Sequence, residues 1–287
     1  HIAMNPLTEQ VIRSFQQINN ERHRFLITTL IRKLHEYVEE VQPNEDEWLN
    51  AIQFLTDTGK LCDEKRQEYI LLSDVLGVSM LMDQILHEKN DVQTPSTVFG
   101  PFFAENMPVR PFAASIVKDG QGSDKPLLVR GTVRDTQGKP LSGVKMDVWQ
   151  TAENGMYSGQ DPEQTADNLR GVFISREDGA YAFQTILPVS YPIPSDGTVG
   201  RLLNYAQRNI WRPAHIHFKL ESPQHQHLVT HLFLAGDEYL QNDAVFGVKE
   251  RLIVSYRDCQ ADAQSREQYG INQDYRLMEY DFILTEA

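Results

Sequence analysis

The stretch Leu127–Val148, LLVRGTVRDTQGKPLSGVKMDV, decides the fold. Its first eight residues are rich in the aliphatic and β-branched side chains that strands favour. Asp135-Thr-Gln-Gly138 is a polar turn signal. Beyond the turn, Val144, Met146 and Val148 occupy alternate positions, which places all three on one face of a strand. The pattern therefore predicts a strand, a turn and a second strand.

Short runs of the same kind follow at 172–175, 181–183, 214–220, 229–234 and 277–284. Asp178-Gly179, between the first two runs, predicts a hairpin. Many short strands at this spacing are typical of a β-sandwich or barrel. We therefore expect an α+β protein in which residues 104–287 form an antiparallel β-sandwich domain that follows an N-terminal helical region.

That helical region is expected to cover residues 4–103. An apolar stripe at i, i+3, i+4 and i+7 spacing predicts its first long helix, with Ile27, Leu30, Ile31, Leu34, Val38 and Val41 on one face. Pro43 ends this helix, because proline has no backbone N–H to continue the hydrogen bonding.

Two more helices are expected before the strands begin. Asn44 and Glu47 have the spacing of a capping box that opens a helix, and Thr58-Gly59 predicts where it ends. A third helical stretch covers 67–87 and is weakened at Gly77. Several parallel apolar stripes give this region more apolar surface than a small helical cap requires, which favours a homodimer interface over a simple helical core.

Composition excludes some classes of partner. The 287 residues contain 27 Lys and Arg against 40 Asp and Glu, a formal net charge of −13, whereas binding to nucleic acid or to an anionic membrane calls for a basic surface. No segment approaches the roughly 18–20 uncharged apolar residues of a membrane span, and no basic start precedes an apolar run. Cys62 and Cys259 belong to no metal or redox motif. We expect a reduced, cytoplasmic protein.

The most distinctive motif is Arg212-Pro-Ala-His-Ile-His-Phe218. Residues two apart in a strand share a face, so His215 and His217 project together about 7 Å apart at the backbone. Two imidazoles on one strand can form half of a metal site, although two half-buried structural histidines would give the same pattern. The absence of a nearby Cys excludes a thiolate zinc site, but a catalytic zinc site completed by a carboxylate or by one of His225, His227 and His231 stays open.

Two tyrosines lie in segments that hold them rigidly. Tyr191 lies in Ser190-Tyr-Pro-Ile-Pro194, where the prolines fix an extended backbone, and Tyr157 lies in the glycine-flanked Asn154-Gly-Met-Tyr-Ser-Gly159. Phenolates are hard anionic donors, and together with two imidazoles they suit ferric iron. The charge of the metal would allow phenols with a reference pKa near 10 to ionise at neutral pH.

The order and spacing of Tyr157, Tyr191 and Arg212–His217 resemble those of the intradiol ring-cleavage dioxygenases. Residues 127–150, residues 94–103 and the helical region also resemble this family, so the resemblance covers nearly the whole chain. It implies one Fe(III) per subunit, held by Tyr157, Tyr191, His215 and His217. It further implies that Tyr191 leaves the metal as the general base and that Arg212 stabilises developing negative charge.

The same resemblance has consequences for assembly. It implies that residues 104–287 are the catalytic domain and that the N-terminal helices mediate homodimerisation. It also implies that a lipid can lie between these helices.

Within the family, the pocket positions are similar to those of hydroxyquinol-cleaving members rather than catechol-cleaving members. The substrate-binding residues implied are Leu71, Asp74, Val98, Phe99, Gly100, Pro101, Phe102, Ile193, Pro194, Arg212 and Val245. Asp74 can accept a hydrogen bond from a third ring hydroxyl, which catechol lacks. His231 stands where catechol-cleaving members usually carry Gln, beside the expected ligands.

The reaction implied is cleavage of hydroxyquinol (benzene-1,2,4-triol) by O₂ to 3-hydroxy-cis,cis-muconate, which tautomerises to maleylacetate. Cleavage of catechol or a substituted catechol is the alternative within the family. Outside the family, a zinc hydrolase would give no role to Tyr157 and Tyr191, and a non-enzymatic β-sandwich module with a helical dimerisation arm would have no reason to retain iron.

Overall fold

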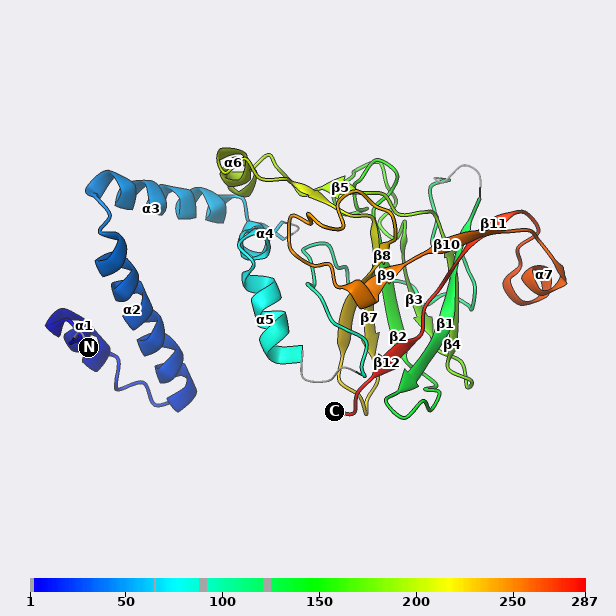
Figure 1. Cartoon of the computed structure of the whole chain (residues 1–287), viewed down its shortest axis with the longest axis horizontal. Helices are drawn as coiled ribbons and strands as arrows, with labels where there is room; N and C mark the ends of the chain where they lie inside the picture. Colours follow the sequence, from blue (N-terminus) through cyan, green and yellow to red (C-terminus); the bar gives the residue numbers. More distant parts are fainter. Residues whose placement is uncertain (1–2, 65, 88–91, 121–124) are drawn as a thin grey trace. The chain divides into compact units, whose positions relative to one another are not determined.

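The structure is a computed structural model that describes residues 3–64, 66–87, 92–120 and 125–287. The chain divides into two compact units, His1–Asp57 and Thr58–Ala287. Figure 1 shows the elements of both units along the chain. Each unit is described below by itself.

The first unit is helical and contains α1 (Pro6–Ser14), α2 (Glu21–Val41) and most of α3 (Glu45–Lys60). The predicted stripe falls on α2, which ends where Gln42 adopts a left-handed backbone just before Pro43. The capping box is confirmed, because the Asn44 backbone N–H donates to Glu47 Oε1 over 2.9 Å and the Glu47 N–H donates to Asn44 Oδ1 over 2.8 Å. The predicted end at Thr58-Gly59 is wrong by a residue: α3 continues through Gly59 to Lys60.

The second unit begins with two short helices, α4 (Glu68–Val75) and α5 (Val78–His87). Gly77 separates them with a φ of 76°, a backbone conformation that glycine adopts without steric cost. The predicted weak point at Gly77 is therefore a complete break, and the two helices are bent by 75°. Among the described residues, no single helix is long and apolar enough to cross a membrane, and this bent pair meets the length and composition criteria only together.

Two five-stranded sheets form the body of the second unit. The first sheet has the order β10-β11-β1-β12, and β4 pairs with the other edge of β1. Its strands are β1 (Leu127–Asp135), β4 (Ala180–Thr185), β10 (Tyr256–Cys259), β11 (Tyr275–Glu279) and β12 (Phe282–Leu284). The second sheet has the order β3-β2-β7-β8-β9. Its strands are β2 (Lys145–Trp149), β3 (Arg170–Ile174), β7 (His215–Glu221), β8 (Leu228–Leu234) and β9 (Ile253–Val254).

Smaller elements connect the sheets. The strands β5 (Tyr191–Pro192) and β6 (Trp211–Arg212) pair with each other, and α6 (Thr198–Tyr205) lies between them in sequence. The 3₁₀ helix η1 (Glu250–Leu252) precedes β9, and α7 (Ala263–Tyr269) precedes β11.

The expected combination of N-terminal helices and β-sheets is confirmed, but the expectation of an antiparallel sandwich is confirmed only in part, since both sheets are mixed. β1 pairs in parallel with β11 along its first half and with β12 along its second half, and β8 pairs in parallel with β9. The partner changes at Gly131, where an added Cβ would lie 1.7 Å from the backbone oxygen of Tyr280. Only glycine allows this close approach of the two backbones.

The predicted hairpin at Asp178-Gly179 is also wrong. The turn itself forms, with Gly179 at a φ of 80° and its N–H donating to the Arg176 carbonyl over 2.8 Å. The flanking strands β3 and β4 nevertheless belong to different sheets, because β3 pairs with β2 and β4 pairs with β1. The turn therefore connects the two sheets.

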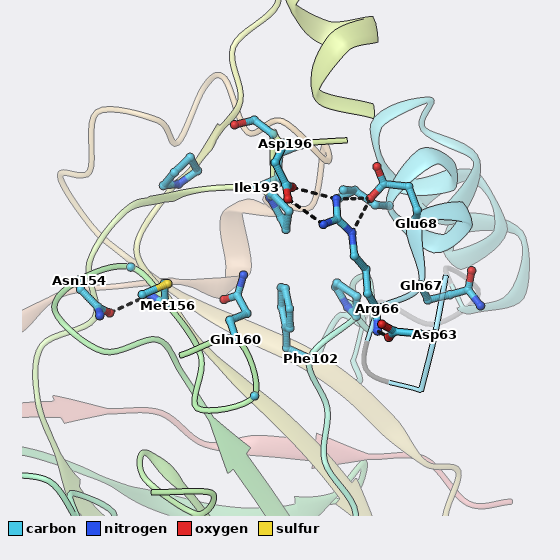
Figure 2. Close-up of a pocket in the computed structure, with 17 residues that line it drawn as sticks. Asp63, Arg66, Gln67, Glu68, Phe102, Asn154, Met156, Gln160, Ile193 and Asp196 are labelled. Atoms are coloured by element: carbon cyan, nitrogen blue, oxygen red, sulfur yellow. Dashed lines mark hydrogen bonds and ion pairs between the residues drawn. The ribbon is translucent and has the colours of Figure 1, made fainter. Parts of the chain in front are cut away.

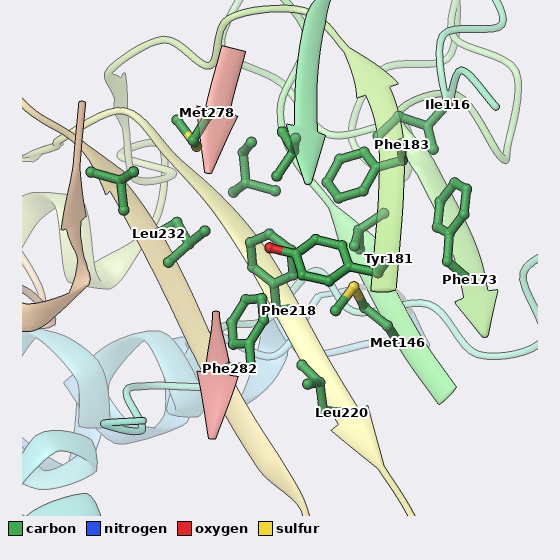
Figure 3. Close-up of a cluster of buried hydrophobic side chains, with 14 of the residues drawn as sticks. Ile116, Met146, Phe173, Tyr181, Phe183, Phe218, Leu220, Leu232, Met278 and Phe282 are labelled. Atoms are coloured by element: carbon green, nitrogen blue, oxygen red, sulfur yellow. The ribbon is translucent and has the colours of Figure 1, made fainter. Parts of the chain in front are cut away.

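A single apolar cluster lies between the two sheets (Figure 3) and takes side chains from both of them. Phe218 of β7 lies 6.0 Å from Phe183 of β4 and 5.0 Å from Phe282 of β12 between ring centroids. Both rings that flank Phe218 come from the first sheet, so this cluster holds the two sheets face to face. It also fixes β7, the strand that carries the predicted histidine pair.

Candidate metal centre and active site

Strand register brings the histidines together. β7 is the central strand of its sheet, with β2 on one side and β8 on the other. His217 lies opposite Trp149 of β2 and opposite His231 of β8. The indole of Trp149 stacks on the His217 ring at 4.8 Å and 12°. On the neighbouring two-stranded ribbon, the register places Tyr191 opposite Arg212.

The four predicted ligand side chains converge. The hydroxyl of Tyr157 lies 2.5 Å from His217 Nε2 and 2.7 Å from the hydroxyl of Tyr191. The Tyr191 hydroxyl is 3.2 Å from His215 Nε2, and the two Nε2 atoms are 3.1 Å apart. Donor atoms that each bind one ion at about 2 Å lie about 3 Å from one another, so this cluster is close to the separation that a metal would impose.

The orientation of the imidazoles suits metal binding. His215 Nδ1 lies 2.7 Å from the Pro213 carbonyl, to which it donates as the protonated nitrogen, and this leaves the lone pair of Nε2 directed at the cluster. Burial and the Arg212 charge lower the pKa of His215 to about 3. Burial also holds the pKa of His217 well below its ordinary value. Both rings are therefore neutral, which is the form that coordinates metals.

The phenols are buried as well. Burial and the neighbouring Tyr191 raise the pKa of Tyr157 well above its ordinary value. Burial raises the pKa of Tyr191, and the positive charge of Arg212 opposes this rise. Phenols buried in this way stay protonated unless a cation replaces their protons, and a bound metal ion supplies such a charge.

Arg212 is held in place by a carboxylate. Its Nε donates to Asp243 Oδ1 over 3.0 Å and one terminal nitrogen donates to Asp243 Oδ2 over 3.2 Å, with both side chains buried. Asp243 also accepts hydrogen bonds from the backbone N–H groups of Val245 and Gly247. The Asp243 charge raises the pKa of Arg212 against the opposing effect of burial. The other terminal nitrogen of Arg212 lies 3.2 Å from His215 Nε2, at the edge of the donor cluster.

His231 completes a group of three buried histidines with His215 and His217, whose ligand atoms lie within 4.8 Å of one another. His231 Nδ1 is 3.4 Å from a terminal nitrogen of Arg212, so His231 contacts the same guanidinium as Asp243. Burial lowers the pKa of His231 well below its ordinary value. Neutral Nδ1 can therefore accept a hydrogen bond from Arg212. His225 and His227, two of the residues considered for a zinc site, are outside this group.

A cavity of roughly 500 Å³ is lined by Met156 and Pro192, the sequence neighbours of the two tyrosines, but by neither tyrosine itself. Five of the predicted substrate-binding residues line it, namely Leu71, Pro101, Phe102, Ile193 and Pro194. Phe102 stacks on Tyr157 with centroids 4.6 Å apart. Figure 2 shows Phe102 and Ile193 in the middle of this lining, with Gln160 and Met156 on one side of them and Arg66 on the other. In the same view the guanidinium of Arg66 lies between the carboxylates of Glu68 and Asp196.

The other predicted pocket residues lie outside that lining. Val98 and Val245 are packed in one buried cluster with Leu71 and Ile193. The backbone at Gly100 passes so close to His217 that an added Cβ would lie 3.3 Å from its Cε1. The side chain of Phe99 is 42% exposed and packs on Phe103 and Trp149 rather than on the tyrosines.

Asp74 lies on α4 and is buried. It accepts a hydrogen bond from the Ser79 hydroxyl over 2.6 Å. Burial raises the pKa of Asp74 to about 6, although Ser79 and the charge of Arg212 oppose this rise. The Asp74 side chain thus belongs to the same electrostatic environment as Arg212.

Two protein-family models together match almost the whole chain. The model described as "Dioxygenase" matches residues 98–286, and the one described as "Catechol dioxygenase N terminus" matches residues 20–94. The chain belongs to the intradiol ring-cleavage dioxygenases. It is therefore an oxidoreductase.

Individual relatives cover most of this dioxygenase. A hydroxyquinol 1,2-dioxygenase of Rhizobium sp. is 44% identical over 96% of this chain and 93% of the relative. A catechol 1,2-dioxygenase of Candida albicans is 36% identical over 96% of this chain and 91% of the relative. The crystal structure of hydroxyquinol 1,2-dioxygenase from Pseudomonas putida superposes with a TM-score of 0.87, at 47% identity and 98% coverage of both chains.

Three buried residues of the dioxygenase were missed by sequence reasoning. Asp243 pairs with Arg212, Trp149 stacks on His217, and Arg170 lies over the ring of Tyr157. The period-two pattern in β2 could have placed Trp149 on the face opposite Val144, Met146 and Val148, but not beside His217. Asp243 and Arg170 carry no local signal, because their partners lie 31 and 13 residues away in sequence.

Proposed function

We propose that this protein cleaves hydroxyquinol between its two adjacent hydroxyl-bearing carbons with O₂, forming 3-hydroxy-cis,cis-muconate, which tautomerises to maleylacetate. The observation that supports this most directly is the convergence of two phenols and two imidazoles within 2.5–3.2 Å beside a cavity. The hydroxyquinol 1,2-dioxygenases similar to this chain support the choice of substrate.

We propose Tyr157, Tyr191, His215 and His217 as the ligands of one Fe(III) per subunit. Two anionic oxygen donors and two neutral nitrogen donors form a hard set that stabilises the ferric state. When bound, Fe(III) would supply a Lewis acid that chelates the diol and makes its ring reactive toward O₂.

Tyr191 is the base in this proposal. Its hydroxyl lies between Tyr157 and His215, and its backbone is anchored by pairing with Arg212. Burial favours the protonated phenol, so the Tyr191 phenolate readily takes a proton from an incoming hydroxyl group. Tyr157, stacked under Phe102, stays in place as a ligand.

Arg212 is proposed to stabilise negative charge on the substrate oxygens. Asp243 occupies its Nε and one terminal nitrogen, while the remaining terminal nitrogen lies 3.2 Å from His215 Nε2. A guanidinium that is oriented before the reaction can act on developing charge without first having to rearrange.

We propose that the substrate ring is contacted by Leu71, Val98, Pro101, Phe102, Ile193, Pro194 and Val245. At Gly100 the backbone rather than a side chain approaches the substrate, and Phe99 lies at the edge of the pocket. Asp74 is proposed to accept a hydrogen bond from the third hydroxyl of hydroxyquinol, either directly or through Ser79. This contact would favour the triol over catechol, because a buried acceptor left without a partner is costly.

Oxygen uptake with hydroxyquinol and with catechol tests the proposal. The two substrates are compared side by side with iron-loaded protein, and an enzyme-free blank is subtracted because the triol autoxidises. We expect clear preference for hydroxyquinol. Equal or greater uptake with catechol would support the alternative of a catechol or substituted-catechol dioxygenase, and no uptake with either from iron-containing protein would overturn both.

We also propose that residues 104–287 form the catalytic domain and that residues 4–103 form a helical dimerisation and linker region, which also supplies one wall of the pocket, with a homodimer formed through the N-terminal helices. Six large apolar side chains of α2 support this, because each is at least half exposed: Phe25, Leu30, Leu34, Tyr37, Val38 and Val41. A lipid between helices is a second way to cover such a surface, and mass spectrometry of an organic extract of the protein tests for it.

A further inference from the structure

Arg170 is a buried arginine next to a predicted ligand. It begins β3, where it lies opposite Trp149 in the register, and only 3% of it is exposed. Its guanidinium carbon is 5.8 Å from the ring centroid of Tyr157. Neither the family resemblance carried by Tyr157, Tyr191 and Arg212–His217 nor the proposed mechanism gives it a role.

The hydrogen bonds of Arg170 join the two segments that enclose Tyr157. Its Nε donates to Ser158 Oγ over 2.6 Å, in the loop that carries Tyr157. One terminal nitrogen donates to the Phe102 carbonyl over 2.6 Å, and the ring of Phe102 stacks on the phenol ring of Tyr157. Arg170 therefore fixes both the loop of the tyrosine and the aromatic ring that covers it.

The charge of Arg170 has no carboxylate partner. Among the described residues, no Asp or Glu forms an ion pair with it, whereas the other arginine at the centre, Arg212, is paired with Asp243 through two hydrogen bonds. An unpaired buried guanidinium is costly, and an adjacent anion reduces that cost.

We propose that Arg170 is a positioning residue for Tyr157 and the counter-ion of its phenolate in the metal-loaded protein. This inference rests on the proposed function, because Tyr157 is an anion only as a metal ligand. The two central arginines then differ in role. Arg212, whose charge is already shared with Asp243, faces the reacting groups, whereas Arg170 offsets the charge of the ligand that stays in place.

Three variants test the proposal, each measured for iron content after dialysis and for the visible tyrosinate-to-iron absorption band. Arg170→Gln removes the charge, and Arg170→Lys keeps it without the two-segment hydrogen bonds. Arg110→Gln is the matched control, since Arg110 is a neighbouring arginine that donates to the Arg170 carbonyl and pairs with Asp167 but, within the part of the chain that the structure describes, forms no hydrogen bond or cation–π contact with a tyrosine. Circular dichroism establishes that each variant is folded.

We expect Arg170→Gln to weaken iron retention about tenfold, because the loop of Tyr157 and the segment of Phe102 lose the hydrogen bonds that position them. The band should move to longer wavelength, because a phenolate without its counter-ion gives up charge to the iron more easily. Arg170→Lys should restore most of the band position, and Arg110→Gln should leave it unchanged. Folded Arg170→Gln with wild-type iron retention and band position would overturn this inference alone. A wild-type protein that binds iron without any such band would overturn the proposed ligand set as well.

Discussion

At the scale of single residues, the two tyrosines have different surroundings despite their shared chemistry. Tyr157 is fully buried beneath Phe102 and beside Arg170, whereas Tyr191 belongs to a two-residue strand paired with Arg212. Tyr157 thus has an aromatic ring and a guanidinium against its phenol ring, whereas Tyr191, which is also buried, has its backbone paired with that of Arg212. This difference predicts that the two phenols respond differently to substitution.

Replacement of Tyr157 by Phe should bleach the visible band and reduce turnover severely, because it removes a ligand that stays bound. Replacement of Tyr191 by Phe should leave some iron in place but abolish most turnover through loss of the base. Iron content and the visible spectrum, measured with oxygen uptake, separate the two. Tyr181→Phe is the matched control, since Tyr181 is an equally buried phenol that donates to the Tyr280 carbonyl in the core. An unchanged spectrum in Tyr157→Phe would contradict the assignment.

Asp74 gives a prediction about substrate choice. Asp74→Ala should reduce turnover of hydroxyquinol more than turnover of catechol, because only the triol has the hydroxyl that Asp74 is proposed to accept from. The ratio of kcat/KM for the two substrates measures this directly. An equal loss of kcat/KM for both substrates would show that Asp74 does not determine the choice of substrate.

Asp74 also affects stability in a pH-dependent way. Burial raises the pKa of Asp74 to about 6, above the value of about 3.9 for an unfolded Asp, so its ionised form costs stability. This cost is absent below about pH 4, grows as the pH rises, and is complete above about pH 6. Asp74→Asn should therefore raise the free energy of unfolding, on the order of 2 kcal/mol at about pH 7.5 and less at about pH 5. Urea titrations at the two pH values test this; an equal gain at both would exclude it.

The site residues that could be predicted from the sequence are those whose signal lies within a few neighbouring residues. The pair His215 and His217 follows from the period of a strand, and the rigid loops of Tyr157 and Tyr191 follow from their glycines and prolines. Asp243 and Arg170 could not be predicted, because their importance arises from a buried charge that finds, or lacks, a partner only in the folded chain.

At the scale of elements, local patterns predicted where strands and helices lie but not how they associate. The strand at 127–134 was expected and forms as β1, yet its parallel partners β11 and β12 come from a distant part of the sequence. The Asp178-Gly179 turn forms as expected, but its two strands join opposite sheets. Pairing is decided by packing between whole sheets, which no window of ten residues contains.

The break between α4 and α5 predicts opposite effects for two glycine substitutions. Gly77→Ala should lower the free energy of unfolding by about 1 kcal/mol, because Gly77 has a φ of 76° and Ala is strained there. Gly59→Ala should raise it by about 0.5–1 kcal/mol, because Gly59 lies inside α3 and its added Cβ would meet Tyr69 only at 3.6 Å, an ordinary contact. Thermal and urea unfolding measure both variants. A stabilising Gly77→Ala would show that the bend is not required.

At the scale of the whole molecule, the chain combines a strongly acidic surface with a helical unit rich in exposed apolar side chains. The net charge is −13, which limits non-specific association, whereas α2 buries none of its residues within a single chain. A specific apolar interface between two copies would reconcile these features.

Leu34→Glu should therefore shift the protein from dimer toward monomer, because it places a charge within the exposed apolar stripe of α2. Arg32→Glu provides the control, since residue 32 lies on the opposite side of this helix from residue 34. Light scattering coupled to size-exclusion chromatography at several protein concentrations measures the result. A wild-type protein that is monomeric at every concentration would contradict the dimer.

The parallel pairing of β1 has a consequence for biosynthesis. Leu127 pairs with Arg276, a partner synthesised 149 residues later (276 − 127), so the first sheet cannot be completed until that segment has left the ribosome. During that interval the apolar edge of β1 has only β4 beside it, and unpaired strand edges are prone to aggregate. The second unit is therefore expected to finish folding only after translation. Its folding yield should depend on chaperones more strongly than that of the helical unit, whose contacts are local in sequence.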